Sequence, residues 1–313
     1  MSSYNSLLNT AESALRNYGK NGDGSLECIG IDLNIDGVCN EKVYRYCRST
    51  NDDIIDWRDQ LDSSLARTIE RFEERGIIKF REVSKVQSGI GNQYKLYFSV
   101  KCNIPLEQHE NETELFFKEF GYNGENLIKN AERCVSSHLS PGRSSILMLG
   151  VDLCEDSISG IKAHLSLERF AEYSQRIGEK LFFEEIEDAI SDVIQKIDSS
   201  DNGEECLRIG KVSTACLFYP FMIGINHYGK QSEFKLYFRI KYSGLNDEQI
   251  LENTINMIRN MDRYIDSKQL EQTAIEMYKI GLFMEGFAIS CKDGCAPTIK
   301  TYFFPVPKGK IKV

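Results

Sequence analysis

The sequence has no long apolar run and no surplus of positive charge. No stretch approaches the ~20 apolar residues of a transmembrane helix, so no membrane partner is expected. The net charge is −9, which argues against a nucleic-acid partner, because phosphate contacts need a basic face. The first residues, MSSYNSLLNTAESALRNYGK, lack the apolar segment of a signal peptide. We therefore expect a cytoplasmic protein.

Common catalytic and metal-binding motifs are also missing. The chain contains no Gly-x-Ser-x-Gly nucleophile elbow, no P-loop and no Gly-x-Gly-x-x-Gly segment. Its ten cysteines form no Cys-x-x-Cys pair and its four histidines show no metal-ligand spacing, so no metal site is predicted. We interpret the cysteines as reduced core thiols, because most of them fall within apolar strand patterns (Cys28, Cys47, Cys102, Cys154, Cys216 and Cys291).

What the chain does have is a repeated alternation of helix and β-hairpin. Runs typical of paired strands, each interrupted by a turn signal such as Asp36-Gly37 or Asp293-Gly294, are predicted at 26–48, 77–102, 144–168, 212–243 and 282–304. Apolar residues at three- and four-residue spacing predict helices over 51–75, 112–137, 168–198 and 246–280. The period is roughly 60 residues. No linker or composition break interrupts it, so we expect a single domain over 1–313.

The second strand of four hairpins carries the same polar pair on one face. Each places a lysine two residues before a tyrosine or histidine, as Lys95/Tyr97, Lys162/His164, Lys235/Tyr237 and Lys300/Tyr302. The opposite faces are apolar and are the only surface on which the helices can pack. In an open sheet the polar face would meet solvent, whereas in a closed barrel it would line the lumen. Ten antiparallel strands would make that lumen wide enough for a ligand.

A lumen of lysines and tyrosines suits one kind of ligand. Residues two apart on a strand are separated by about 6.6 Å, so each cation is a neighbour of the ring beside it. Buried lysines without carboxylate partners would repel one another at a cost of several kcal/mol, which a bound diphosphate would offset. Aromatic faces stabilise a carbocation by ~1–2 kcal/mol. The combination favours prenyl transfer, with water excluded by the closed barrel.

These strand motifs resemble those of the ABBA prenyltransferases, soluble enzymes named for αββα units around a ten-strand barrel. The resemblance spans nearly the whole chain in its order of elements. Within the superfamily, the chain is similar to the clorobiocin- and naphterpin-pathway enzymes and their fungal relatives. It implies an α+β fold, with ten antiparallel strands in five αββα repeats and the helices outside. It also implies a monomer whose partners are a prenyl diphosphate and an aromatic acceptor.

The resemblance assigns roles residue by residue. Tyr-Arg-Tyr-Cys-Arg-Ser at 44–49 is similar to the family's first-hairpin motif and implies a diphosphate-binding Arg45. The other implied diphosphate contacts are Lys95, Lys162, Tyr219, Lys235 and Lys300, and the implied cation-shielding residues are Tyr97, His164, Tyr237 and Tyr302. His164 departs from the tyrosine usual at its position. Because KVYRYCR lacks the acid that holds Mg²⁺ in some members, no cofactor or metal is expected.

Glu27 in SLECIGI is similar to the glutamate that accepts the acceptor's proton in the indole branch, although it could equally be a carboxylate at the solvent end of a strand. The implied activity is transfer of a dimethylallyl or geranyl group to an electron-rich aromatic small molecule of secondary metabolism. Two alternatives remain open: prenylation of a side chain in a ribosomal, cyanobactin-like peptide, and a non-catalytic barrel that binds a diphosphate.

Overall fold

The structure is a computed structural model. It describes residues 26–34, 37–48, 63–88, 91–101, 104–121, 125–139, 144–154, 157–167, 187–194, 207–208, 218–228, 231–240, 246–261, 265–292, 295 and 297–305. Parts of the helices predicted at 51–75 and 168–198 lie outside these ranges.

Five antiparallel hairpins form the centre of the molecule. Their strands are β1 (Leu26–Asn34), β2 (Gly37–Arg48), β3 (Ile78–Ser88), β4 (Gly91–Val100), β5 (Ile146–Cys154), β6 (Ser157–Ser166), β7 (Phe218–Tyr228), β8 (Gln231–Ile240), β9 (Leu282–Lys292) and β10 (Thr298–Pro305). Each strand pairs with its neighbours in the chain, and β1 pairs with β10 to close a barrel. The alternation read from the sequence had located all five hairpins.

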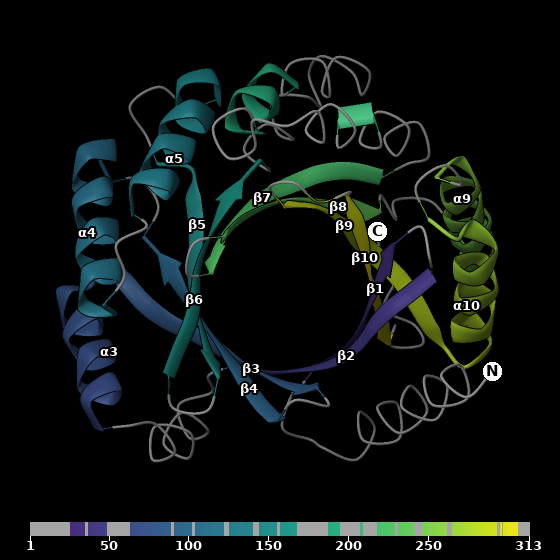
Figure 1. Ribbon diagram of the computed structural model, residues 1–313, viewed down its shortest axis with the longest axis horizontal. Helices are drawn as coiled ribbons and strands as arrows, with labels where there is room; N and C mark the ends of the chain where they lie inside the picture. The colour runs from purple at the N-terminus through teal and green to yellow at the C-terminus, as the bar shows by residue number, and fades with distance from the viewer. Residues whose placement is uncertain are drawn as a thin grey trace.

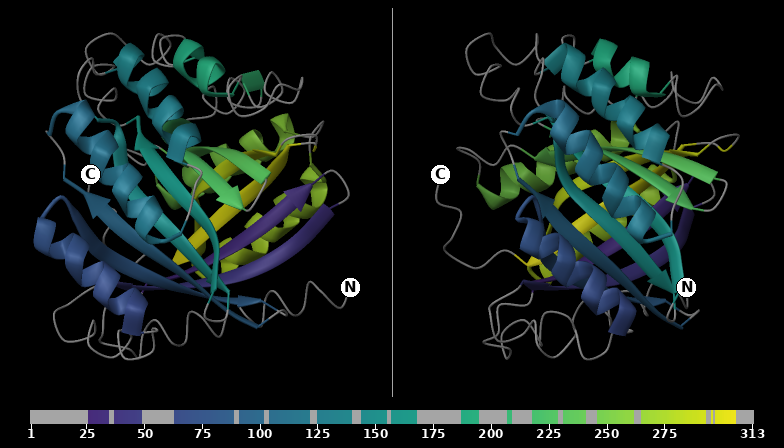
Figure 2. Two further views of the ribbon diagram at one scale, coloured as in Figure 1. Left: turned by 60° about the vertical axis from the view of Figure 1, so that its left-hand side comes forward. Right: turned by 90° about the vertical axis from the view of Figure 1, so that its left-hand side faces the viewer.

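The described helices surround the barrel, as Figures 1 and 2 show. They include α3 (Ser63–Arg75), α4 (Leu106–Glu119), α5 (Glu125–Leu139), α9 (Asp247–Asn260) and α10 (Ser267–Lys279). Helix α3 contacts β3, α5 contacts β6, and α10 contacts β9, while α4 and α9 pack on α5 and α10. An antiparallel α+β barrel with its helices outside is therefore confirmed.

The segment predicted as one helical stretch at 246–280 consists of two helices. A capping box of Asn246 and Gln249 starts α9, and the Asp266 side chain accepts a hydrogen bond from the backbone N–H of Gln269 to start α10. Caps of this kind satisfy backbone donors that a helix start leaves unpaired. Apolar periodicity continues across the break, which is why the pattern alone did not reveal it.

The apolar strand faces form the core against the helices. Leu96 and Phe98 on β4 are at most 1% exposed. The Phe98 ring meets Phe116 of α4 edge-on, with the ring centroids 5.0 Å apart. The equivalent faces of β6, β8 and β10 are buried in the same core. The prediction that the helices pack on the apolar faces is confirmed, and it leaves the lysine and tyrosine faces directed into the barrel.

The interpretation of every cysteine as a reduced core thiol is wrong for Cys291. That residue is buried on β9 and is disulfide-bonded. Cys134, Cys154 and Cys295 are not disulfide-bonded, and Cys295 is exposed. Burial alone does not keep a thiol reduced, because a packed core can also bring two sulfurs together.

Among the described residues, no helix is long and apolar enough to cross a membrane.

Candidate active site

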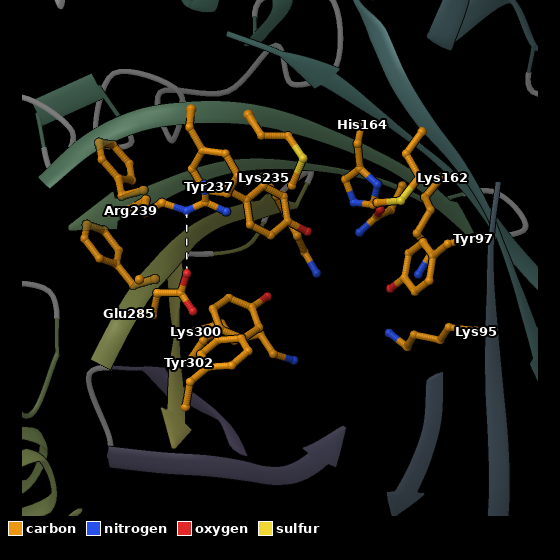
Figure 3. Close-up of a pocket in the computed structure, with 18 residues that line it drawn as sticks. Lys95, Tyr97, Lys162, His164, Lys235, Tyr237, Arg239, Glu285, Lys300 and Tyr302 are labelled. Carbon is orange, nitrogen blue, oxygen red and sulfur yellow. Dashed lines mark ion pairs between the residues drawn. The ribbon is translucent and has the colours of Figure 1, made fainter. Parts of the chain in front are cut away.

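Four lysines on alternate strands line one cavity inside the barrel. Their side chains come from β4, β6, β8 and β10 and point into the lumen in Figure 3 (Lys95, Lys162, Lys235 and Lys300). Lys162 and Lys300 are at most 8% exposed. The barrel thus brings together four predicted diphosphate contacts that the sequence separates by more than 200 residues.

Carboxylates accompany the lysines, contrary to the expectation of an unpaired lysine cluster. Asp152 on β5 places Oδ1 2.5 Å from Lys162 Nζ and Oδ2 4.0 Å from Lys95 Nζ. Glu233 on β8 places Oε2 3.0 Å from Lys235 Nζ. Both acids stand nearer the hairpin turns than the lysines do, and cross-strand register brings Asp152 opposite Lys95. Within the described part of the lumen, four lysines still outnumber the two acids beside them.

The excess of positive charge in the lumen affects the pKa of Lys95. Burial, and then the charge of Lys162, lower the pKa of the Lys95 ammonium well below its usual range, while Asp152 opposes this. Lys300 and Lys235 add to the repulsion. A bound anion would place negative charge beside Lys95 and favour its charged form. The four lysines, which we call the lysine layer, are therefore suited to a multiply charged anion.

Glu233 is held by several groups at once. It accepts hydrogen bonds from Ser290 Oγ and, at 2.6 Å, from Asn226 Nδ2, besides its contact with Lys235. Burial acts to raise the pKa of Glu233, but Lys235 and these hydrogen bonds outweigh it and lower that pKa from 4.5 to about 2. The charged carboxylate therefore stabilises the fold.

This network predicts a specific pH dependence of stability. Because the folded pKa of Glu233 lies below the unfolded value, its contribution is fully present above pH 4.5 and is lost as the pH falls toward 2. We expect Glu233→Gln to reduce the free energy of unfolding at pH 7 by about 2–3 kcal/mol and to flatten its fall between pH 4.5 and 2. Urea denaturation at several pH values measures both. Parallel wild-type and variant pH curves would contradict the assignment.

A row of aromatic rings follows the lysines along the lumen. The ring centroids of Tyr97 and His164 are 5.9 Å apart, those of His164 and Tyr237 are 5.7 Å apart, and those of Tyr237 and Tyr302 are 6.4 Å apart. Lys162 Nζ lies 5.5 Å from the Tyr97 ring centre, and Lys300 Nζ lies 5.8 Å from that of Tyr302. All four predicted shielding residues therefore form one arc beside the predicted diphosphate contacts.

His164 belongs to this arc as an uncharged ring. Burial, and then Lys162 and Lys235, lower the pKa of His164 from 6.5 to about 3. At neutral pH it adds no positive charge, so it presents an aromatic face where the resembling family usually has tyrosine.

An inward-facing glycine makes room for one of the lysines. Gly150 on β5 is paired with Lys162 across the strands, and a Cβ built at Gly150 would lie 2.4 Å from Lys162 Cγ. We expect Gly150→Ala to push the Lys162 stem away from Asp152 and to cost about 1–3 kcal/mol of folding stability. Thermal unfolding, with Ser99→Ala on the neighbouring strand as a control, tests this. A variant as stable as the wild type would show that the stem relaxes freely.

Beyond the aromatic arc, a charged pair faces the cavity. Arg239 Nε on β8 lies 3.8 Å from Glu285 Oε1 on β9, and Figure 3 marks this pair. The Arg239 guanidinium also lies 4.5 Å from the ring centre of Phe221. Along β8 the inward face therefore reads Glu233, Lys235, Tyr237 and Arg239, which spans about 20 Å at 6.6 Å per two residues.

Three predicted site residues cannot be placed in this lumen. The backbones of Glu27 and Arg45 are paired with each other between β1 and β2, and that of Tyr219 on β7 is paired with Arg239. Their side chains lie outside the described part of the structure, so their roles stay predictions.

Other site residues were missed in the sequence. Glu233 had a usable signal, because it stands two residues before Lys235 on the same strand face. Asp152 gave no signal of its own, because its contact with Lys162 depends on the register between β5 and β6. Alternation does not decide the face of Glu285, because the buried residues Met284 and Phe287 imply opposite faces for it.

The chain was compared with known proteins. No protein-family profile matches it, and no curated protein matches it in sequence. Solved structures do match in fold. Prenyltransferase PriB in complex with product diphosphate has a TM-score of 0.53 and 12% identity, over 90% of this chain and 79% of that one. The apo form of PriB has a TM-score of 0.51 and 11% identity, over 90% and 80% of the two chains.

A further match is the 5-dimethylallyl tryptophan synthase from Streptomyces coelicolor in complex with DMASPP and Trp. Its TM-score is 0.52 and its identity 11%, over 92% of this chain and 82% of that one. At this level of identity the likeness concerns the fold alone. The chain has the fold of the prenyltransferase barrels.

Proposed function

We propose that the protein is an aromatic prenyltransferase, which transfers an allylic group from its diphosphate to an electron-rich aromatic small molecule. The observation that carries this proposal is the lysine layer beside an arc of four aromatic rings in one lumen. An ionising prenyl diphosphate separates into a diphosphate anion and an allylic cation. The lysines suit the anion, and the aromatic rings suit the cation.

In this mechanism the lysines stabilise the leaving diphosphate as the allylic C–O bond breaks. Its proposed contacts are Arg45, Lys95, Lys162, Tyr219, Lys235 and Lys300. The faces of Tyr97, His164, Tyr237 and Tyr302 stabilise the allylic cation until the acceptor ring attacks. Because the lysines supply positive charge where a metal would, we propose that no metal is required. Glu27 is the candidate base proposed from the sequence.

The solved structures with this fold support the substrate classes. The PriB structure is a complex with product diphosphate, and the tryptophan synthase structure is a complex with DMASPP and Trp. We propose dimethylallyl or geranyl diphosphate as the donor and a role in secondary metabolism.

We propose a finer organisation of the chain as well. It comprises five αββα repeats in one domain spanning 1–313, and it acts as a cytoplasmic monomer.

Size-exclusion chromatography with light scattering tests whether the protein is a monomer. Alkylation of cysteines without reductant, followed by mass spectrometry, tests the compartment. A persistent disulfide at Cys291 would favour an oxidising environment.

The activity is tested by incubating the protein, with and without EDTA, with dimethylallyl and geranyl diphosphates. The acceptor panel comprises dihydroxynaphthalenes, hydroxybenzoates, indoles and tyrosine-containing peptides, and products are read by mass spectrometry. We expect a prenyl mass gain on an aromatic small molecule, unaffected by EDTA. A gain on peptides alone would favour the peptide prenyltransferase. Diphosphate binding without any transfer would favour a binding protein.

A further inference from the structure

The β9 strand contains a bulge that turns one carboxylate into the lumen. Pairing with β10 shifts register between Gly286–Tyr302 and Met284–Phe303, which leaves Glu285 as the additional residue on β9. The bulge depends on Gly286, because a Cβ there would lie 2.2 Å from the backbone oxygen of Phe238. On either side of it, Met284 and Phe287 are both buried in the outer core. A bulge is a means of re-aiming a side chain.

The Glu285 carboxylate lies next to the place that an acceptor must occupy. On β8, Arg239 follows Tyr237 on the inward face, and Gly286 is paired with both Arg239 and Tyr302. A ring that attacks a cation held by Tyr237 and Tyr302 must lie beside those rings, on the side away from the lysines. Phe221, whose ring centre is 6.3 Å from that of Tyr237, offers an apolar wall there.

The contacts leave Glu285 able to accept a proton from a ligand. Its distance of 3.8 Å to Arg239 is an ion pair without hydrogen-bond geometry. The carboxylate is half-buried and lines the cavity. Burial raises the pKa of the Glu285 carboxyl above 4.5, and Arg239 opposes this. A base with a raised pKa accepts a proton more readily near neutral pH.

We propose that Glu285, rather than Glu27, is the general base, and that it selects acceptors whose aromatic ring carries an N–H or O–H group. This rests on the proposed prenyl transfer. Arg239 acts as a positioning residue that keeps the carboxylate directed across the mouth of the aromatic arc.

The allylic C–O bond breaks and its electron pair leaves with diphosphate, while an acceptor ring carbon forms the new C–C bond. Glu285 takes the N–H or O–H proton, which leaves a neutral imine- or keto-type ring. The hydrogen on the alkylated carbon then leaves to water or diphosphate, and Glu285 returns its proton to the heteroatom. The ring is aromatic again, and one proton is released with the diphosphate.

The test compares Glu285→Gln with the wild type on paired acceptors: indole and N-methylindole, and a naphthol and its methyl ether. We expect Glu285→Gln to lower kcat/KM for the protic acceptors by at least about 100-fold. On the methylated acceptors, which have no such proton to give, Glu285→Gln and the wild type should have equal kcat/KM. A structural defect would slow both members of each pair alike. Glu248→Gln, a control on the exposed start of α9, should leave the ratios at the wild-type value.

Two further readouts separate the possible failures. Calorimetric donor affinity of Glu285→Gln should equal that of the wild type, which shows that the barrel is folded. The acidic limb of the wild-type pH profile should disappear in Glu285→Gln, since Arg239 on β8 and Tyr302 on β10, the described groups that flank it, do not titrate in the acidic range. If the wild type transfers a prenyl group and Glu285→Gln matches it on indole, Glu285 is not the base. If the wild type transfers nothing, the proposed function itself fails.

Discussion

Replacement of Lys95 by alanine is expected to lower kcat/KM for the prenyl diphosphate by about 10²–10³-fold. Removing one preorganised donor that faces developing negative charge costs this much in other enzymes. Lys95 belongs to the lysine layer, and its Nζ lies 4.0 Å from Asp152 Oδ2. Burial and then the neighbouring lysines lower its pKa, so a bound anion would favour the charged ammonium. Steady-state kinetics with varied donor concentration measure the effect.

A matched surface lysine controls for charge alone. Lys279 at the end of α10 is exposed and pairs only with Glu276 among the described contacts, so Lys279→Ala should leave both kcat and KM unchanged. Lys235→Ala should behave like Lys95→Ala, with a higher donor KM and slower turnover. If Lys95→Ala and Lys235→Ala both retain wild-type activity, the lysine layer does not hold the donor.

Replacement of Asp152 by asparagine is expected to weaken the fold and strengthen anion binding. Asp152 is buried and faces both Lys162 and Lys95, and burial alone would raise its pKa, but these lysines lower it. Removal of one member of a buried ion pair costs about 3–5 kcal/mol, because the other charge is left uncompensated. We therefore expect this loss in the free energy of unfolding, measured by urea denaturation without ligand.

Inorganic diphosphate should restore much of that stability. An anion that binds only the folded state stabilises it in proportion to its affinity, and the affinity rises when the lumen loses a negative charge. The variant should gain more stability from diphosphate than the wild type does. Glu119→Gln, which removes an exposed partner of Arg71, is the control and should cost less than about 1 kcal/mol. Equal stabilisation of Asp152→Asn and wild type by diphosphate would contradict an anion site beside Asp152.

Most of what the sequence could predict followed from the regular alternation of side chains along the strands. The lysine at 235 and the tyrosine at 237 share a face because side chains alternate with period two, and the buried positions between them confirm that face. The same rule puts Arg239 on the polar face as well. Repetition over four hairpins made closure around a polar lumen a reasonable prediction.

The rule fails where the strand is irregular or where the contact depends on register. Alternation from Met284 would direct Glu285 inward but would also direct Phe287 inward, whereas Phe287 is buried in the outer core and stacks on Phe238. The bulge absorbs the extra residue, and no local signal beyond Gly286 marks it. The Asp152–Lys162 contact follows from register between β5 and β6, which the sequence of either strand alone does not specify.

Calorimetric titration of the protein with dimethylallyl thiolodiphosphate, a donor analogue, tests the central claim most directly. The account predicts one binding event per chain in EDTA-containing buffer, with an affinity that falls at least tenfold in Lys95→Ala and is unchanged in Lys279→Ala. Absence of binding, or equal affinities in the two lysine variants, would contradict the assignment of the lumen as a prenyl diphosphate site.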